Sequence, residues 1–247
     1  MNIYQSIIDN KNKGKKQFAV LIDPDKPTEN ELLRIAELSL TANVDYFFVG
    51  GSLLTNNHLE NCIHILKNNT AVPVVLFPGN TMQISKYADA ILLLSLISGR
   101  NAEMLIGKHV IAAPYLKESG LEIIPTAYML IESGKATTVT YMSNTFPIPA
   151  DKEDIAACTA MAGEMLGLKI IYLDAGSGAL NPVSSKMIEQ VRKQTVSPVI
   201  TGGGIKTATK AIENCKAGAD IIVVGNAIEK SAVLIKEIGD AVRGFSN

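Results

Sequence analysis

Tryptophan is absent from the 247-residue sequence, cysteine occurs only three times, and long hydrophobic runs are missing. The longest apolar stretches, such as AILLLSLI at 90–97, fall well short of the ~20 residues that a membrane-spanning helix needs. The N-terminal segment has no long apolar stretch followed by a cleavage site, so we expect no signal peptide. These absences favour a soluble, cytoplasmic protein, although one that could still meet a membrane surface.

Cysteine spacing and charge argue against further classes of protein. Cys62, Cys158 and Cys215 lie far apart, without the CxxC spacing of a metal or redox site. Each falls on the apolar stripe of an expected helix, so we expect three buried, reduced thiols. Lysine and arginine number 23 against 24 aspartates and glutamates, a net charge of −1. This balance gives no sign of a nucleic-acid-binding field, and any anion site must therefore be local.

Eight short apolar runs alternate with amphipathic segments. Most of the runs are continuously apolar, as parallel strands covered on both faces are. Their number predicts a single closed (β/α)8 barrel, an α/β fold, as one domain over residues 1–247. The expected strands cover residues 17–23, 45–51, 73–78, 88–96, 121–130, 169–175, 198–203 and 219–226.

The segments between the runs carry helix signals. Thr28 with Glu31 predicts a capping box, and Asn181 followed by Pro182 predicts the start of the helix after the sixth strand. Apolar residues recur at helical spacing in two segments: Leu59, Cys62, Ile63 and Leu66, and Ala208, Ala211, Ile212 and Cys215. A long helix should open at 151 or 152 and run to about Gly167, with an apolar face of Ile155, Cys158, Ala162 and Met165.

Two connections depart from the regular pattern. Only nine residues, GNTMQISKY, separate the third and fourth runs, too few for a full outer helix. We expect the barrel to have a side opening there, with the outer helix short or missing. The segment 134–149 after the fifth strand is predicted to be a long loop.

Three glycine-rich segments follow the last three strands: YLDAGSG at 172–178, TGGG at 201–204 and VGN at 224–226. In a (β/α)8 barrel these strand ends are neighbours on the face that carries the active site. Glycine lets an anion approach backbone N–H groups, and helix N-termini add partial positive charge. Any one of them could simply form a tight turn. Three adjacent ends together, with the Ser177 hydroxyl, favour a phosphate site.

Oxygen ligands lie on the opposite side of the predicted mouth. Asp23 ends the first strand and Ser52 follows the second, and such oxygens suit Mg²⁺ that keeps several waters and a substrate phosphate. Pro24 holds Asp23 extended, away from the following helix. The alternative is that Asp23 and Asp25 only form or cap the turn before Thr28, and the residues alone leave this choice open.

LIDPDK at 21–26, FVGGS at 48–52, YLDAGSG at 172–178, TGGGIK at 201–206 and VGNAIE at 224–229 occur in one order along nearly the whole chain. In this combination the sequence resembles the geranylgeranylglyceryl phosphate synthase family, which is related to bacterial heptaprenylglyceryl phosphate synthase. The resemblance implies a modified barrel that lacks one outer helix and joins sn-glycerol 1-phosphate to a polyprenyl diphosphate, with Mg²⁺ as cofactor.

The resemblance also implies roles for single residues. Asp23 and Ser52 match the Mg²⁺ positions. At Asp174 the archaeal pattern often has the longer glutamate. At the position of Leu21 the heptaprenyl branch has a lysine, so the leucine favours the geranylgeranyl branch. The glycerol phosphate positions are Tyr172, Leu173, Asp174, Ala175, Gly176, Ser177 and Gly178, then Gly203 and Gly204, then Gly225 and Asn226.

The implied reaction is alkylation of the C3 hydroxyl of glycerol 1-phosphate by an allylic diphosphate. Asp174 would accept the hydroxyl proton and Tyr172 would orient that network. Each has a structural alternative, a turn cap for Asp174 and a packed barrel aromatic for Tyr172. The side opening and the segment from Tyr128 to Phe146, with Met129 and Tyr141, are candidate walls of a prenyl groove. We interpret Arg100 as a solvated residue at the start of a helix. His58, His64 and His109 do not have the spacing of metal-binding histidines, and we assign them no catalytic role.

Other classes stay open at this point. They are a heptaprenylglyceryl phosphate synthase, another phosphate-binding barrel such as an FMN oxidoreductase or a phosphosugar isomerase, and a non-catalytic phosphometabolite-binding barrel. The family precedent favours a homo-oligomer, and a lipid-like product suggests transient membrane-surface contact without a basic amphipathic helix to mark it. The accepted prenyl chain length is not readable from the sequence.

Overall fold

Eight parallel strands close into a barrel in the chain order β1 to β8 in the computed structural model, which describes residues 2–245. β8 returns to β1, with Phe18 opposite Ile222, and so closes the sheet. The predicted (β/α)8 fold is confirmed. The strands are β1 (Gln17–Ile22), β2 (Tyr46–Val49), β3 (Val74–Leu76), β4 (Ala90–Leu96), β5 (Glu122–Leu130), β6 (Ile170–Asp174), β7 (Val199–Gly202) and β8 (Ile221–Val224).

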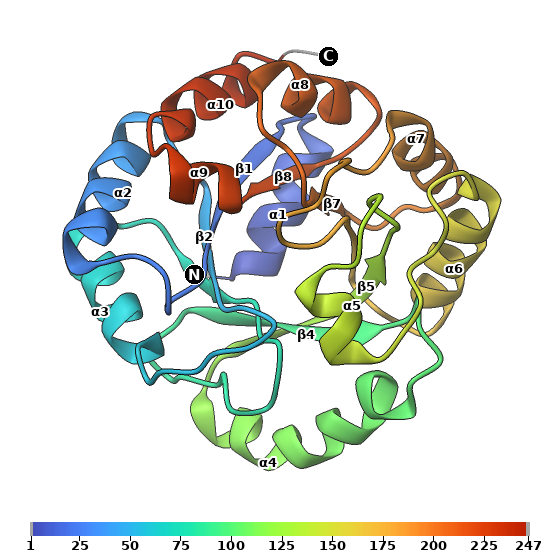
Figure 1. The fold of residues 1–247 in the computed structure, drawn as a ribbon, viewed down its shortest axis with the longest axis horizontal. Coiled ribbons are helices and arrows are strands. Elements are labelled where there is room, and N and C mark those ends of the chain that lie inside the picture. Colours follow the sequence, from blue (N-terminus) through green and yellow to red (C-terminus); the bar gives the residue numbers. More distant parts are fainter. Residues whose placement is uncertain (1, 246–247) are drawn as a thin grey trace.

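Helices form a ring around the strands, and a loop takes the place of a helix between β3 and β4 (Figure 1). The missing outer helix agrees with the short predicted crossover at 79–87. The expected long loop after β5 contains the short helix α5. The helices are α1 (Ile3–Asn12), α2 (Glu29–Thr41), α3 (Leu59–Asn69), the π-helical η1 (Glu103–Gly107), α4 (Lys108–Ser119), α5 (Thr138–Ser143), α6 (Glu153–Met165), α7 (Ser185–Gln194), α8 (Ala208–Lys216), α9 (Asn226–Lys230) and α10 (Leu234–Arg243). Among residues 2–245 no helix is both long and apolar enough to cross a bilayer.

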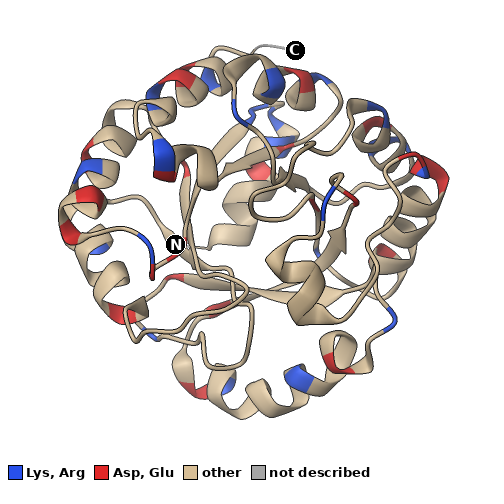
Figure 2. Ribbon diagram, viewed as in Figure 1, with Lys and Arg blue, Asp and Glu red and all other residues tan. Residues whose placement is uncertain are grey.

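Side chains alternate between two apolar layers because successive strand residues point to opposite faces. On β6, Ile170 and Tyr172 belong to the cluster inside the barrel, whereas Ile171 and Leu173 belong to the cluster between strands and helices. Asp174 has the same parity as Tyr172 and therefore points inward at the carboxyl end of the strand. The charged residues belong mainly to the ring of helices and to the loops (Figure 2).

The first helix closes the amino-terminal end of the barrel. Ile3 and Ile7 of α1 are 1% exposed and pack with the interior cluster. The Glu122 carboxylate, at the start of β5, accepts hydrogen bonds from the Ile3 and Tyr4 N–H groups and fixes the start of the helix. With this end closed, the carboxyl ends of the strands form the open mouth.

The buried face of α6 differs from the prediction. Ile155, Cys158, Ala162 and Met165 are exposed, and the buried residues are instead Ala156, Ala157, Ala160 and Gly163. Close packing explains the difference, because a β-carbon on Gly163 would lie 2.9 Å from Cβ of Ala127 on β5. Only small residues fit this helix–strand contact, while hydrophobicity alone favours the larger ones. Cys158 is thus an exposed thiol, and only Cys62 and Cys215 are buried as expected.

The start of α7 also differs. Asn181 and Pro182 do not begin the helix; Ser184 is the N-cap, and its hydroxyl accepts from the Met187 N–H at 3.2 Å. The Asn181 N–H instead donates to the Ser133 carbonyl at 3.1 Å and ties this segment to the loop after β5. By contrast, the capping box of Thr28 and Glu31 on α2 is confirmed.

Candidate active site

A cavity of about 720 Å³, here called the main cavity, opens at the carboxyl ends of the strands. Residues predicted from opposite sides of the mouth line it together. The three glycine-rich turns after β6, β7 and β8, here called the phosphate loops, share this mouth with the ends of β1 and β2, and the turn after β8 lies beside the end of β1 rather than opposite it. The predicted residues that line the main cavity are Asp23, Ser52, Asp174, Ser177, Gly178, Gly203, Gly204, Gly225 and Asn226.

Four residues of the predicted YLDAGSG segment are not among those that line the main cavity: Tyr172, Leu173, Ala175 and Gly176. Leu173 faces the outer helices, and Ala175 is buried. Tyr172 is 1% exposed, and its ring lies 5.2 Å from that of Phe77 and 5.6 Å from that of Tyr128, centroid to centroid. The structure therefore puts Tyr172 in the aromatic layer beneath the cavity floor.

Asp174 is the buried carboxylate of the main cavity, at 7% exposure. Its Oδ2 accepts from the Tyr128 hydroxyl at 2.5 Å, and its Oδ1 accepts from the Gly176 N–H at 2.7 Å. Burial raises the pKa of Asp174 above its usual value, and the two hydrogen bonds oppose part of that rise. The pKa of Tyr128 is also raised, by burial and by the charge of Asp174, so this phenol remains a donor. A desolvated carboxylate with an elevated pKa is a competent proton acceptor.

Replacing Tyr128 with phenylalanine removes a hydrogen bond that favours the ionised form of Asp174. The pKa of Asp174 should then rise further, so the acid limb of the kcat–pH profile should move to higher pH. We expect a displacement of about one to two pH units, because a charge-assisted hydrogen bond contributes about 1.5–3 kcal/mol. Steady-state rates between pH 4 and pH 8 measure it, and an acid limb at the wild-type position would contradict this role for Tyr128.

One side chain joins two of the three phosphate loops. Asn226 Oδ1 accepts from the Ser177 hydroxyl at 2.7 Å and from the Gly178 N–H at 2.8 Å, which joins the loops after β6 and β8. Gly203, with φ +79°, packs so closely that a β-carbon there would lie 2.7 Å from the Gly176 nitrogen and 2.8 Å from Asp174 Oδ1. Backbone groups of three strand ends thus converge beside the carboxylate.

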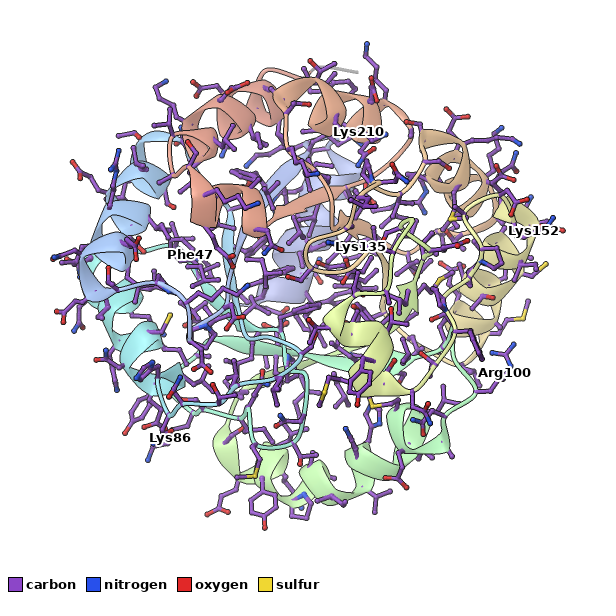
Figure 3. All side chains as sticks on the ribbon, viewed as in Figure 1. Phe47, Lys86, Arg100, Lys135, Lys152 and Lys210 are labelled. Carbon is purple, nitrogen blue, oxygen red and sulfur yellow. The ribbon has the colours of Figure 1, made fainter. Side chains whose placement is uncertain are left out.

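Four lysines line the main cavity: Lys26, Lys135, Lys206 and Lys230. The cavity is also lined by three carboxylates, those of Asp23, Asp174 and Glu229. Its lining residues therefore carry a net positive charge, although the chain as a whole is nearly neutral. Lys135 lies near the middle of the barrel, while Arg100 lies on the outer ring (Figure 3). A β-carbon built on Gly178 would be 3.8 Å from Lys135 Nζ. Lys26 and Lys206 end the segments LIDPDK and TGGGIK, whereas Lys135 and Lys230 belong to none of the recognised segments. None of the four was predicted as a site residue, because a single lysine is most often solvated.

The predicted metal residues, Asp23 and Ser52, both line the main cavity. Asp23 Oδ1 accepts from the Asp25 N–H at 3.2 Å, so the turn interpretation holds for this atom. Oδ2 lies 3.4 Å from Lys26 Nζ, a cation already beside the carboxylate. A β-carbon on Gly51 would come within 3.3 Å of Asp23 Oδ2, so the absence of a side chain there keeps this oxygen accessible. Two oxygen donors from the protein fit a Mg²⁺ ion that keeps several water ligands. Among residues 2–245 there is no group of three or more His, Cys, Asp or Glu side chains that could hold a metal ion.

An apolar groove adjoins the main cavity. It runs between the β3–β4 crossover, β4 and α4, at the predicted side opening, and its walls include Phe77, Ile84, Leu93, Met104, Leu116 and Met142. Gly51, Ser52, Phe77, Tyr128 and Val139 line both spaces.

Of the residues predicted to line a prenyl groove, Tyr128 lines this apolar groove and the other three lie elsewhere. Met129 is fully buried in the layer between strands and helices, because it alternates with Tyr128 along β5. Tyr141 and Phe146 are 85% and 93% exposed and are not among the groove's lining residues. On α5, the residues that line the groove are Val139, Met142 and Ser143.

A closed barrel of eight parallel strands, with a cavity at their carboxyl ends, puts the chain in the class of (β/α)8-barrel proteins. A family model described as the PcrB family matches residues 10–242. The chain therefore belongs to the PcrB family.

Named relatives cover nearly the full chain. It is 60% identical over 240 residues to a geranylgeranylglyceryl phosphate synthase of Chitinophaga pinensis, which covers 97% of this chain and 95% of the relative. A protein of the same name from Methanothermobacter marburgensis is 40% identical over 233 residues, 94% of each chain. The crystal structure of (S)-3-O-geranylgeranylglyceryl phosphate synthase from Thermoplasma acidophilum, in complex with substrate sn-glycerol-1-phosphate, matches with a TM-score of 0.93 at 32% identity, over 99% of this chain and 100% of that one.

Proposed function

We propose that this protein is a prenyltransferase that joins sn-glycerol 1-phosphate to geranylgeranyl diphosphate and releases diphosphate. The observation that carries the proposal is the arrangement of the mouth. Phosphate loops and a buried carboxylate lie in one cavity, and an apolar groove begins at its wall. The relatives named geranylgeranylglyceryl phosphate synthase, at up to 60% identity, support the same reaction.

The phosphate loops would hold the glycerol phosphate. N–H groups of the turns after β6, β7 and β8 and the Ser177 hydroxyl are donors for phosphate oxygens, and the Lys135 ammonium would balance their charge. A phosphate anchored at three strand ends fixes the rest of the glycerol, so its C3 hydroxyl can reach Asp174. Such alignment of two reactants can supply roughly 7–11 kcal/mol of the barrier.

Asp174 would take the proton as the C3 oxygen attacks. The new bond forms between this oxygen and C1 of the prenyl chain, the C1–O bond to diphosphate breaks with its electron pair, and the hydroxyl proton passes to the Asp174 carboxylate. Phe77 and Tyr128, which line both spaces, present aromatic rings where the allylic carbon becomes cation-like. Mg²⁺ held by Asp23 and Ser52 would neutralise charge on the departing diphosphate.

The apolar groove would take the prenyl tail. Its walls are aliphatic and aromatic side chains from the crossover, β4 and α4, so it can accept a hydrocarbon chain whose diphosphate remains in the main cavity. Leu21 lines the main cavity at the position where the heptaprenyl branch has lysine, which supports the geranylgeranyl donor.

The direct test is turnover with purified protein, glycerol 1-phosphate and prenyl diphosphates of several lengths, with Mg²⁺ or with EDTA. We expect geranylgeranylglyceryl phosphate as the main product in Mg²⁺ and none in EDTA. Mass spectrometry of the organic extract identifies it. Binding of glycerol phosphate without any ether product would identify a non-catalytic barrel, and a heptaprenyl product would assign the longer donor.

Asp23→Asn should weaken the metal site specifically. Asparagine keeps the oxygen that accepts from the Asp25 N–H but loses the negative charge that a hard cation requires. The Mg²⁺ concentration for half-maximal rate should rise about tenfold or more, with the KM for glycerol 1-phosphate at saturating Mg²⁺ changed less. A magnesium titration of the rate measures this, with Asp25→Asn as the matched control, and equal shifts in the two variants would exclude a special role for Asp23.

A further inference from the structure

Asp23 and the phosphate loops are joined by a continuous chain of side-chain contacts. Lys26 Nζ lies 3.4 Å from Asp23 Oδ2 and 3.2 Å from each oxygen of Glu229. Asn226 Nδ2 donates to Glu229 Oε2 at 3.1 Å. The other end of the Asn226 amide, Oδ1, accepts from Ser177 and Gly178. We call Lys26, Glu229 and Asn226 the relay.

Each end of the relay stands where a ligand of the proposed function would bind. At Asp23 the Lys26 ammonium is a cation on the carboxylate proposed for Mg²⁺. At the phosphate loops, Asn226 Oδ1 accepts from a hydroxyl and an N–H that a phosphate oxygen would otherwise engage. The relay therefore satisfies the charge and the hydrogen-bonding groups of both subsites at once, and both ligands must displace a part of it.

The contacts within the relay can be replaced by contacts with a bound ligand. The side chains of Lys26, Glu229 and Asp23 are 41%, 23% and 21% exposed. Ion pairs with this exposure are screened by water and contribute little net stability, so a dication or a phosphate can replace them. Asn226 and Glu229 lie on α9, a helix of five residues that follows directly on β8.

We propose that Glu229 is a positioning residue that couples the metal subsite to the phosphate subsite through competition for its carboxylate. A phosphate that displaces Asn226 from Ser177 and Gly178 also loosens the Asn226–Glu229 hydrogen bond. Glu229 then interacts more fully with Lys26 and draws this ammonium away from Asp23, which frees the carboxylate for the metal. The inference rests on the proposed function, because it assumes both subsites.

The same exchange runs in the opposite direction. A metal at Asp23 repels the Lys26 ammonium towards Glu229, which weakens the hold of Glu229 on Asn226 and eases the entry of phosphate. Coupling between two sites is reciprocal, so each ligand must tighten the other by the same factor. For the reaction this means that the metal subsite and the phosphate subsite are both fully formed when both ligands are bound.

The test is the affinity for Mn²⁺, followed by its electron paramagnetic resonance signal, with and without saturating glycerol 1-phosphate. In the wild-type protein we expect the Mn²⁺ Kd to fall about fivefold or more when the phosphate is bound, the lower end of typical coupling factors. In Glu229→Gln this ratio should fall by at least about threefold, because the neutral amide does not draw Lys26 from Asp23. Lys26→Met should lower the ratio similarly and should also bind Mn²⁺ more tightly than wild type without phosphate.

Glu213→Gln is the matched control, since Glu213 pairs with Lys210 at 3.4 Å on the outer helix α8. It should keep the wild-type ratio. An unchanged ratio in Glu229→Gln, or a wild-type ratio of one, would overturn the coupling while leaving the proposed function intact, because both ligands would still bind. A wild-type protein that binds neither ligand would overturn both.

Discussion

Asp174→Asn should abolish prenyl transfer while the protein still binds glycerol 1-phosphate. The amide oxygen can accept from the Gly176 N–H and the amide nitrogen can donate to the Tyr128 oxygen, so the geometry of the site is kept. Asparagine cannot accept the C3 hydroxyl proton. We expect kcat to fall on the order of 10²–10⁴-fold, the contribution of a positioned general base. Single-turnover rates together with calorimetric binding of glycerol 1-phosphate measure the two effects separately.

The same variant should be at least as stable as the wild type at neutral pH. Burial raises the pKa of Asp174 in the folded state, so the fold favours the protonated carboxyl. The stability that this preference contributes is present below the usual carboxyl pKa and is lost as pH rises through the raised value. Asparagine carries no charge at any of these pH values, so Tm at pH 7 should hold or increase. A large loss of both Tm and phosphate affinity would show instead that Asp174 is a folding or binding element.

Among glycine-to-alanine substitutions in the phosphate loops, Gly203→Ala should disrupt the site most. Gly203 has φ +79°, and the new β-carbon would lie 2.7 Å from the Gly176 nitrogen, 2.8 Å from Asp174 Oδ1 and 2.9 Å from the Ala175 nitrogen. Backbone atoms cannot move aside cheaply, so the turn after β6 must shift. A misplacement of about 1 Å in a reacting group can cost ~10²-fold. We expect kcat/KM to fall by at least that factor, with weaker binding of glycerol 1-phosphate.

Gly120→Ala is a matched control for backbone strain. Gly120 ends α4 with φ +71°, close to the value at Gly203, but no atom lies within 4 Å of the added β-carbon. The strain of a left-handed alanine, about 1–2 kcal/mol, should lower Tm in both variants. Activity at 25 °C should fall only in Gly203→Ala. Equal activities in the two variants would show that the close approach of the phosphate loops does not matter for the reaction.

The sequence was sufficient to predict the barrel and the meeting of its strand ends. Continuous apolar runs such as ADIIVVGN identify buried parallel strands, and barrel closure then requires that glycine-rich ends of β6, β7 and β8 be neighbours. Asp23 and Asp174 could be placed at the same mouth for the same reason, because each ends a strand. These inferences depend only on local pattern and chain order.

Features that depend on packing between distant elements could not be predicted in this way. The buried face of α6 consists of small residues because β5 lies close, which no property of α6 alone reveals. Lys135 comes from a loop without a motif, and Asn181 is held by Ser133 instead of starting a helix. Tyr128 is the partner of Asp174 only because β5 and β6 are adjacent in a register that pairs Leu130 with Asp174.

The position of bound glycerol 1-phosphate shows whether the phosphate loops and Asp174 act on one substrate. We predict that a crystal structure of this protein with glycerol 1-phosphate will have phosphate oxygens within hydrogen-bonding distance of N–H groups in the turns after β6, β7 and β8. The C3 hydroxyl should then lie within about 2.6–3.2 Å of an Asp174 oxygen. A phosphate bound elsewhere, or a C3 hydroxyl directed away from Asp174, would contradict the account.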